Sequence, residues 1–84
     1  MSLTSEQVRA ARMLLRWEQR DLAEACGVSL PSIKRLESKP GELSAQRRTI
    51  EAIVQALERA GVKFIPENGG GVGLRLAKRT KRSK

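Results

Sequence analysis

The sequence of 84 residues has no histidine and no tyrosine, and it has one cysteine, one tryptophan and one phenylalanine. Neither the acids nor the cysteine are spaced like metal ligands, and without histidine the common acid–base catalyst is missing. The glycine-rich stretch GGGVG at residues 69–73 lacks the Lys-Ser/Thr pair and the following helix of a phosphate-cradling loop. We therefore expect no enzyme activity, no catalytic residue, no metal ion and no cofactor.

The single cysteine and the lack of long apolar runs indicate where in the cell the protein is located. Cys26 cannot form an internal disulfide, and its apolar neighbours favour a small buried side chain over a reactive thiol. No segment resembles a secretory leader or a membrane span. These features predict a reducing, cytoplasmic location without a membrane partner.

Basic residues are what the sequence has in excess. Seventeen Lys and Arg against nine Asp and Glu give a formal net charge of +8. Such a charge favours an anionic partner, most plausibly nucleic acid, over charge that serves solubility alone. We interpret the last segment, residues 77–84, as a basic disordered tail. It is either simply solvated or a contact for phosphates without sequence preference.

The order of patterns along the chain predicts a mostly α fold. The length allows one small domain, and apolar residues at helical spacing predict helices over residues 5–16, 18–25 and 45–60. A shorter helix is expected between Ser29 and the SKPG turn of residues 38–41. Beyond Gly61, VKFI and VGLRL alternate like strands around a turn-rich PENGGG. We therefore predict a four-helix domain over residues 1–61 and a C-terminal β-hairpin over residues 62–76.

Local signals predict where the helices begin and end. Thr4 with a glutamine three residues later predicts a capping box, and Ser44 is expected to cap the fourth helix. Ser29 predicts an N-cap with Pro31 in the first helical turn. Gly27 separates the second and third helices, at a position where glycine can adopt a left-handed backbone conformation without a steric penalty. These two helices and their turn form a helix-turn-helix by pattern.

The segment RWEQRDLAEACGVSLPSIKRLESKPG, residues 16–41, resembles the Cro/repressor type of helix-turn-helix, the XRE family of bacterial and phage regulators. The matching positions are Gln19, Leu22, Ala23, Gly27, Val28, Ser29, Ile33, Leu36 and Glu37, with Arg12 upstream. The resemblance covers roughly residues 5–57. It implies a repressor-like domain whose third helix lies in the DNA major groove while the start of the second touches the backbone.

The resemblance also implies which residues face DNA. The implied DNA-binding residues are Gln19, Ser29, Leu30, Pro31, Ser32, Lys34, Arg35 and Lys39. Arg35 is the principal reader, since a guanidinium can bind guanine O6 and N7 with two hydrogen bonds. Gln19 would donate to a phosphate, although a plain surface role is an equal alternative. Lys34 and Arg35 could instead form a solvated helix face.

Other positions are implied to be structural or depart from the family pattern. Arg12 is expected to pair with Glu37 and to set the angle at which the third helix is presented. Leu30 and Pro31 cannot hydrogen-bond a base, so readout would depend more on DNA shape and phosphate contacts. Glu18 replaces the usual hydroxyl cap of the second helix, and facing DNA it would be repelled.

The resemblance implies a sequence-specific transcriptional regulator, expected to be a repressor, that binds double-stranded DNA. A homodimer on a two-fold-symmetric operator is expected. An antitoxin that binds its operon DNA and a partner toxin is a second interpretation. A nucleoid-type or RNA-binding protein that depends on the basic tail is a third.

The hairpin is predicted to supply the dimer contact, because an isolated two-stranded hairpin is marginal in water and has open edges. Alternation predicts a dimerisation face of Val62, Phe64, Val72, Leu74 and Leu76, with the apolar end of the fourth helix beneath it. The alternative is that the hairpin folds back onto its own helices and the protein binds as a monomer.

Overall fold

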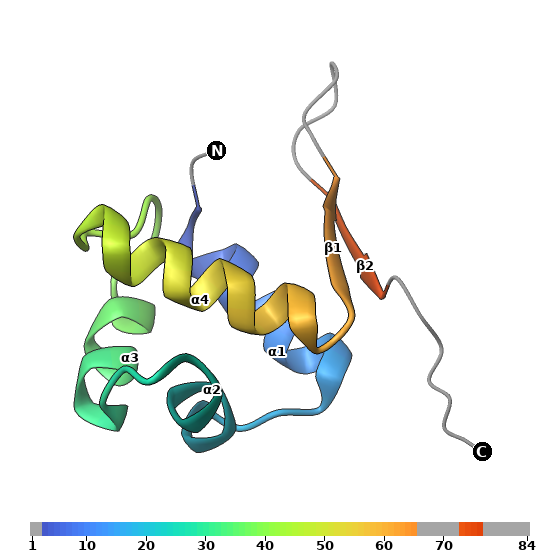
Figure 1. The fold of residues 1–84 in the computed structure, drawn as a ribbon. Coiled ribbons are helices and arrows are strands. Elements are labelled where there is room, and N and C mark those ends of the chain that lie inside the picture. The colour runs from blue at the N-terminus through green and yellow to red at the C-terminus, as the bar shows by residue number, and fades with distance from the viewer. Residues whose placement is uncertain (1–2, 66–72, 77–84) are drawn as a thin grey trace.

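The computed structural model describes residues 3–65 and 73–76, with side chains described up to residue 65. It contains four helices and a two-stranded antiparallel sheet (Figure 1). The elements are α1 (Ser5–Leu15), α2 (Gln19–Cys26), α3 (Leu30–Ser38), α4 (Arg47–Arg59), β1 (Val62–Ile65) and β2 (Gly73–Leu76). The predicted fold class, four helices followed by a hairpin, is confirmed. The predicted basic tail, residues 77–84, and Val72 lie outside the described residues.

The predicted capping box at the start of α1 is confirmed. Thr4 Oγ1 accepts from the Gln7 backbone N–H at 3.1 Å, and Gln7 Oε1 accepts from the Thr4 N–H at 2.9 Å. The helix ends one residue earlier than predicted, because Arg16 adopts a left-handed conformation with a φ of 59°.

The turn between α2 and α3 follows the local signals in the sequence. Gly27 has a φ of 75°, in the left-handed region that favours glycine, and its N–H donates to Ala23 O at 2.9 Å. Ser29 caps α3 by accepting from the Ser32 N–H at 3.3 Å. Pro31 lies in the first turn, where a missing N–H leaves no intrahelical bond unmade.

The predicted cap of α4 is wrong. The helix begins at Arg47, its N-cap is Gln46, and Ser44 lies in the preceding connection. The reason is that this connection is fixed to the start of the chain. The Leu43 N–H donates to Leu3 O at 2.9 Å, and an isolated bridge joins Thr4 to Glu42. These bonds tie residues 42 and 43 to the start of the chain, and the helical backbone begins only at Arg47.

One apolar core joins the helices and the hairpin. Its buried members are Leu3, Val8, Ala11, Leu22, Ala23, Ile33, Leu36, Leu43, Ile53, Leu57, Val62 and Phe64. Val62 and Phe64, predicted for the dimer face, are only 2% and 9% exposed within the single chain. Trp17 packs against this core, as does Cys26, which is half-buried where a small buried side chain was predicted.

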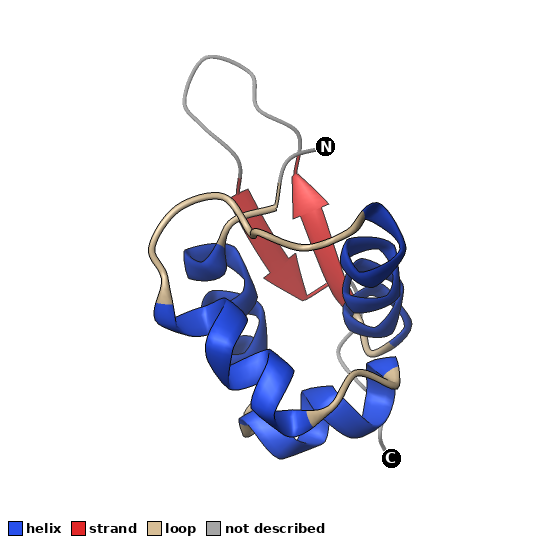
Figure 2. Ribbon diagram, turned by 90° about the vertical axis from the view of Figure 1, so that its left-hand side faces the viewer, coloured by secondary structure: helices blue, strands red, loops and turns tan. Residues whose placement is uncertain are grey.

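The hairpin packs on the side of the helices away from α3. Val62 pairs with Leu76 and Phe64 with Leu74 in an antiparallel register. The sheet contacts α1 and α4, whereas α3 packs against α1 and α2. Figures 1 and 2 show the two strands side by side, and in Figure 1 α3 lies at the opposite end of the molecule. The surface of α3 is therefore left open.

Candidate nucleic-acid interface

The helix-turn-helix is fixed to α1 by a charged pair. Arg12 Nε and Nη2 donate to the two carboxylate oxygens of Glu37, each at 2.8 Å. The side chains are 13% and 3% exposed, so the pair is largely removed from water. Arg12 Nη1 also donates to Trp17 O at 3.0 Å, in the connection between α1 and α2. The expected scaffold contact is therefore present, and it fixes the end of α3 relative to α1.

Two more side chains join this network. Gln19 Nε2 donates to Glu37 Oε1 at 3.1 Å, and Arg9 Nη1 donates to the Glu37 backbone O at 2.9 Å. From the sequence, Gln19 was expected either to contact a phosphate or to be a plain surface residue, and Arg9 carried no predicted role. The structure directs the Gln19 amide inward, to a carboxylate that Arg12 already holds. One of its two amide hydrogens is left over for an outside acceptor.

The outward face of α3 carries the predicted base-reading residues. Pro31, Lys34 and Arg35 are exposed, while Ile33 and Leu36 anchor the helix in the core. Leu30 is half-buried and packs against the core, so less of its side chain is available to a thymine methyl. Of the predicted base-reading residues, the helix thus exposes two cations, Lys34 and Arg35, and Pro31.

The hydroxyl groups at the start of α3 bond to one another. Ser29 Oγ accepts from the Ser32 N–H and donates to Ser32 Oγ at 2.9 Å. The two hydroxyls share this bond, which leaves one of their two hydrogens for an outside acceptor such as a phosphate.

A groove lies between α3 and the start of α4. It has a volume of about 540 Å³ and is lined by Val28, Ser32, Arg35, Leu36, Ser44, Ala45, Gln46 and Thr49. Arg35 and Leu36 also line a smaller hollow of about 80 Å³ with Lys39 and Ser44. Arg35 therefore lines both hollows, and the hydroxyl and amide groups of Ser32, Ser44, Gln46 and Thr49 line the larger one with it.

Charge is unevenly distributed around this groove. Residues 30–48 contain five basic side chains and two acids, and one of those acids is the buried Glu37. The five basic residues, all exposed, are Lys34, Arg35, Lys39, Arg47 and Arg48. Arg35 lines the groove, whereas Arg47 lines a separate hollow along α4 with Ile50 and Glu51. The excess of positive charge in this stretch favours a polyanion as partner.

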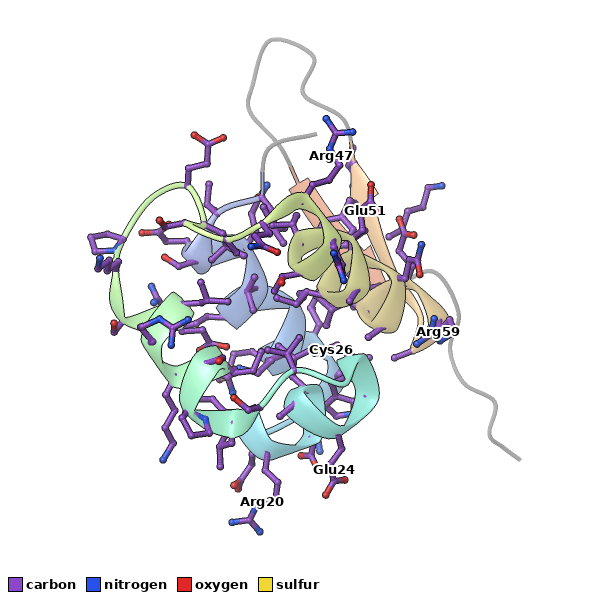
Figure 3. All side chains as sticks on the ribbon, turned by 60° about the vertical axis from the view of Figure 1, so that its left-hand side comes forward. Arg20, Glu24, Cys26, Arg47, Glu51 and Arg59 are labelled. Atoms are coloured by element: carbon purple, nitrogen blue, oxygen red, sulfur yellow. The ribbon has the colours of Figure 1, made fainter. Side chains whose placement is uncertain are left out.

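The start of α2 is less suited to a phosphate than expected. Glu18 and Asp21 are both exposed there, and Asp21 Oδ2 accepts from the Glu18 N–H at 2.8 Å. The Asp21 carboxylate thus occupies one of the N–H groups that a DNA phosphate would use. Figure 3 shows Arg20 and Glu24 projecting outward from the same helix. The favourable potential therefore belongs to α3 and the α3–α4 connection.

Sequence reasoning missed the contribution of residues 44–49. Gln46 and Thr49 line the groove only because the connection folds back against the first residues, which is a tertiary effect, and Arg47 and Arg48 lie between them at the start of α4. One signal was nevertheless present. Arg47 and Arg48 lie in the first turn of α4, where the helix dipole disfavours cations, and no acid is found there.

Residues 3–65 and 73–76 contain no cluster of three or more potential metal ligands. None of the helices described is long and apolar enough to cross a membrane. Burial raises the pKa of the Cys26 thiol, whose sulfur lies 3.9 Å from Ala23 O, so its reactive thiolate is disfavoured.

Comparison with known proteins adds one finding. A family model described as helix-turn-helix matches residues 8–60, which is more than half of the chain. The match begins within α1 and ends just after α4, so it covers the helices and stops before the hairpin. A search of the curated proteins found no match of sufficient significance.

Proposed function

The chain belongs to the Cro/repressor-type family of helix-turn-helix proteins, which are DNA-binding transcription regulators, and we propose that it is a repressor acting as a homodimer. Each copy inserts α3 into the major groove of one half-site of a two-fold-symmetric operator. The observation that carries this proposal is the exposed pair Lys34 and Arg35 beside the polar groove between α3 and α4.

Within this proposal the residues have different tasks. Arg35 reads a guanine from the groove rim, and Lys34 contacts either a second base or a phosphate. Ser32, Lys39 and the start of α4 hold the backbone. Because few side chains on α3 can hydrogen-bond a base, part of the specificity comes from DNA shape. Repression then follows from occupancy of the operator, which requires no surface other than the DNA-binding face.

The test is selection of bound DNA from a random pool. A two-fold-symmetric motif with half-sites about 34 Å apart is the expected result. Arg35→Ala should relax preference at one base pair of each half-site. Recovery of an asymmetric motif would contradict the dimer, and recovery of no motif would contradict sequence-specific regulation. In the latter case an affinity that falls steeply with salt would favour non-specific binding instead.

An antitoxin is the second candidate, and one observation favours it. Met13 is 70% exposed and Leu14 39% exposed near the end of α1, and neither is among the predicted DNA-binding residues. A protein bound there would leave the DNA-binding face free. Co-purification of a second small protein from the native host, lost in the Met13→Glu variant, is the result that this function requires.

A further inference from the structure

We propose that Glu6 and Arg9, two side chains one helical turn apart on α1, clamp the turn that follows α3 and thereby set where Lys39 meets DNA. Neither of the two residues carried a predicted role in DNA binding. This inference rests on the proposed function, because Lys39 is assigned there to the DNA backbone. It adds two positioning residues that act on Lys39 from outside the helix-turn-helix.

The first end of the clamp is the last turn of α3. Arg9 Nη1 donates to the Glu37 backbone O at 2.9 Å. A cation at this place satisfies a carbonyl without a partner inside the helix, and it interacts favourably with the helix dipole. The helix ends at Ser38, and Lys39 is its C-cap in an extended conformation. Lys39 therefore lies two residues after the carbonyl that Arg9 binds.

The second end of the clamp is Gly41. Both carboxylate oxygens of Glu6 accept from the Gly41 N–H, at 3.1 and 3.3 Å, and the Ser5 N–H donates to Gly41 O at 2.9 Å. Gly41 has a φ of 90°, in the left-handed region that favours glycine. Both of its backbone polar groups are thus bonded to the start of α1. That start is itself fixed, since Ser5 is buried in the protein.

The stretch between these two ends is short. It consists of Ser38, Lys39 and Pro40. Ser38 Oγ donates to Arg35 O at 2.7 Å, and the proline ring restricts the backbone after Lys39. A connection bonded at both ends has little conformational freedom, so α1 determines where the Lys39 backbone lies. The Lys39 side chain is exposed and lines a hollow together with Arg35 and Ser44.

The clamp predicts the opposite of what net charge predicts. Glu6 is an exposed acid, so its removal should strengthen binding to a polyanion if charge alone matters. If Glu6 holds the turn, its removal should weaken binding instead. The reason is that Lys39 must then be ordered when DNA binds, and this ordering costs conformational entropy.

The experiment measures binding of the full-length chain to a random-sequence DNA duplex, and to the motif selected from the pool, over a range of salt concentrations. We expect Glu6→Ala to bind both about threefold more weakly than the wild type. Its slope of log affinity against log salt should become shallower, towards that of Lys39→Ala. Glu6→Gln keeps an acceptor for the Gly41 N–H and should recover most of the affinity. Circular dichroism checks that each variant is folded.

Glu58→Ala is the matched control, since it removes the same charge from an exposed position on α4. We expect its affinity to be unchanged or slightly higher than that of the wild type. An equal loss of affinity in Glu58→Ala and Glu6→Ala would overturn the clamp, as would tighter binding by Glu6→Ala.

Combination with Lys39→Ala separates positioning from a general loss of stability. If Glu6 acts through Lys39, adding Glu6→Ala to Lys39→Ala should cause no further loss of affinity. The same holds for Arg9→Ala, whereas a direct phosphate contact by Arg9 would add its loss to that of Lys39→Ala. Additive losses in the double variants would overturn the clamp. Normal binding by Lys39→Ala would also overturn it, while the effect of Arg35→Ala on the selected motif would still test the regulator.

Discussion

Arg12 and Glu37 form a two-bond ion pair at 2.8 Å between the first and third helices, and Gln19 from the second helix donates to the same carboxylate. Three helices thus meet at one buried charge. In such a site the Coulomb attraction mainly offsets the loss of hydration, so the pair fixes geometry more than it adds stability. Its consequence for function is the fixed angle of α3, from which Lys34 and Arg35 project.

Breaking this pair on one side should be costly. We expect Arg12→Ala to lower the free energy of unfolding by about 3 kcal/mol, because the Glu37 carboxylate is then buried without its cation. The double change Arg12→Met with Glu37→Leu should cost less than Arg12→Ala alone. Urea unfolding of both variants measures the difference. If the loss of stability in the double variant equals the sum of the losses in the two single variants, the two charges are not coupled.

Gln19 should behave as part of the scaffold. Its hydrogen bond to a charged group predicts that Gln19→Ala lowers the free energy of unfolding by about 1–2 kcal/mol. Gln19→Glu should cost more, because it places a second carboxylate beside Glu37. The salt dependence of DNA binding tests the additional phosphate contact. A slope that becomes shallower by nearly one unit in Gln19→Ala supports that contact, whereas an unchanged slope restricts Gln19 to the scaffold.

Local sequence signals predicted the helix-turn-helix well, because its ends are decided by nearby residues. The Thr4 capping box, the left-handed Gly27 and the Ser29 cap each act within one helical turn. The start of α4 was misplaced because it depends on Leu43 bonding to Leu3, forty residues away along the chain. A hydroxyl before an apolar stripe cannot reveal such a contact.

The site was predictable in part for the same reason. Helical periodicity separates the exposed Lys34 and Arg35 from the buried Ile33 and Leu36 without any tertiary information. The inward turn of Gln19 depends instead on where the Glu37 carboxylate lies in space. Likewise, alternation along VKFI indicated that one face of β1 is buried, but it could not tell whether the chain's own core or a second copy covers that face.

Acid should weaken one local contact through Glu6. Hydrogen bonds from its own backbone N–H, and then from the Gly41 N–H, lower the pKa of Glu6 from its ordinary value of 4.5. A lowered folded-state pKa means that the charged form stabilises the fold above that value. The contribution is lost as the pH falls through the folded-state pKa. We therefore expect Glu6→Gln to lose less stability on acidification below about pH 4.5.

The measurement for Glu6 is urea unfolding at a series of acidic pH values. Glu51→Gln, at an exposed position on α4, is the control, and it should keep the acid dependence of the wild type. An identical pH dependence in wild type and Glu6→Gln would show that protonation of Glu6 does not change the free energy of unfolding.

Arg35→Ala should reduce both operator affinity and selectivity. Loss of a two-bond contact to guanine predicts a loss of roughly 1–3 kcal/mol in binding free energy. Arg35→Lys should recover charge without the paired geometry, so affinity should return more than selectivity does. Titration of matched and mismatched operators with each variant measures the two separately. An equal loss on every DNA sequence would make Arg35 a phosphate contact.

We expect Arg47 and Arg48, the first residues of α4, to bind phosphates without stabilising the helix. Cations in the first turn oppose the helix dipole, so Arg47→Ala or Arg48→Ala should leave the free energy of unfolding unchanged or raise it slightly. Their DNA affinity should fall on all sequences alike. Each change should make the slope of log affinity against log salt shallower by nearly one unit.

Arg59 provides the control for this last prediction, since it lies at the opposite end of the same helix (Figure 3). Arg59→Ala removes the same charge from the chain, yet it should leave the salt dependence close to that of the wild type. Net charge alone would lower affinity equally in all three variants. A position-dependent loss, in contrast, requires phosphates near the start of α4, next to the groove that Arg35 lines. Equal salt slopes in all three would therefore remove α4 from the interface and restrict DNA contact to α3.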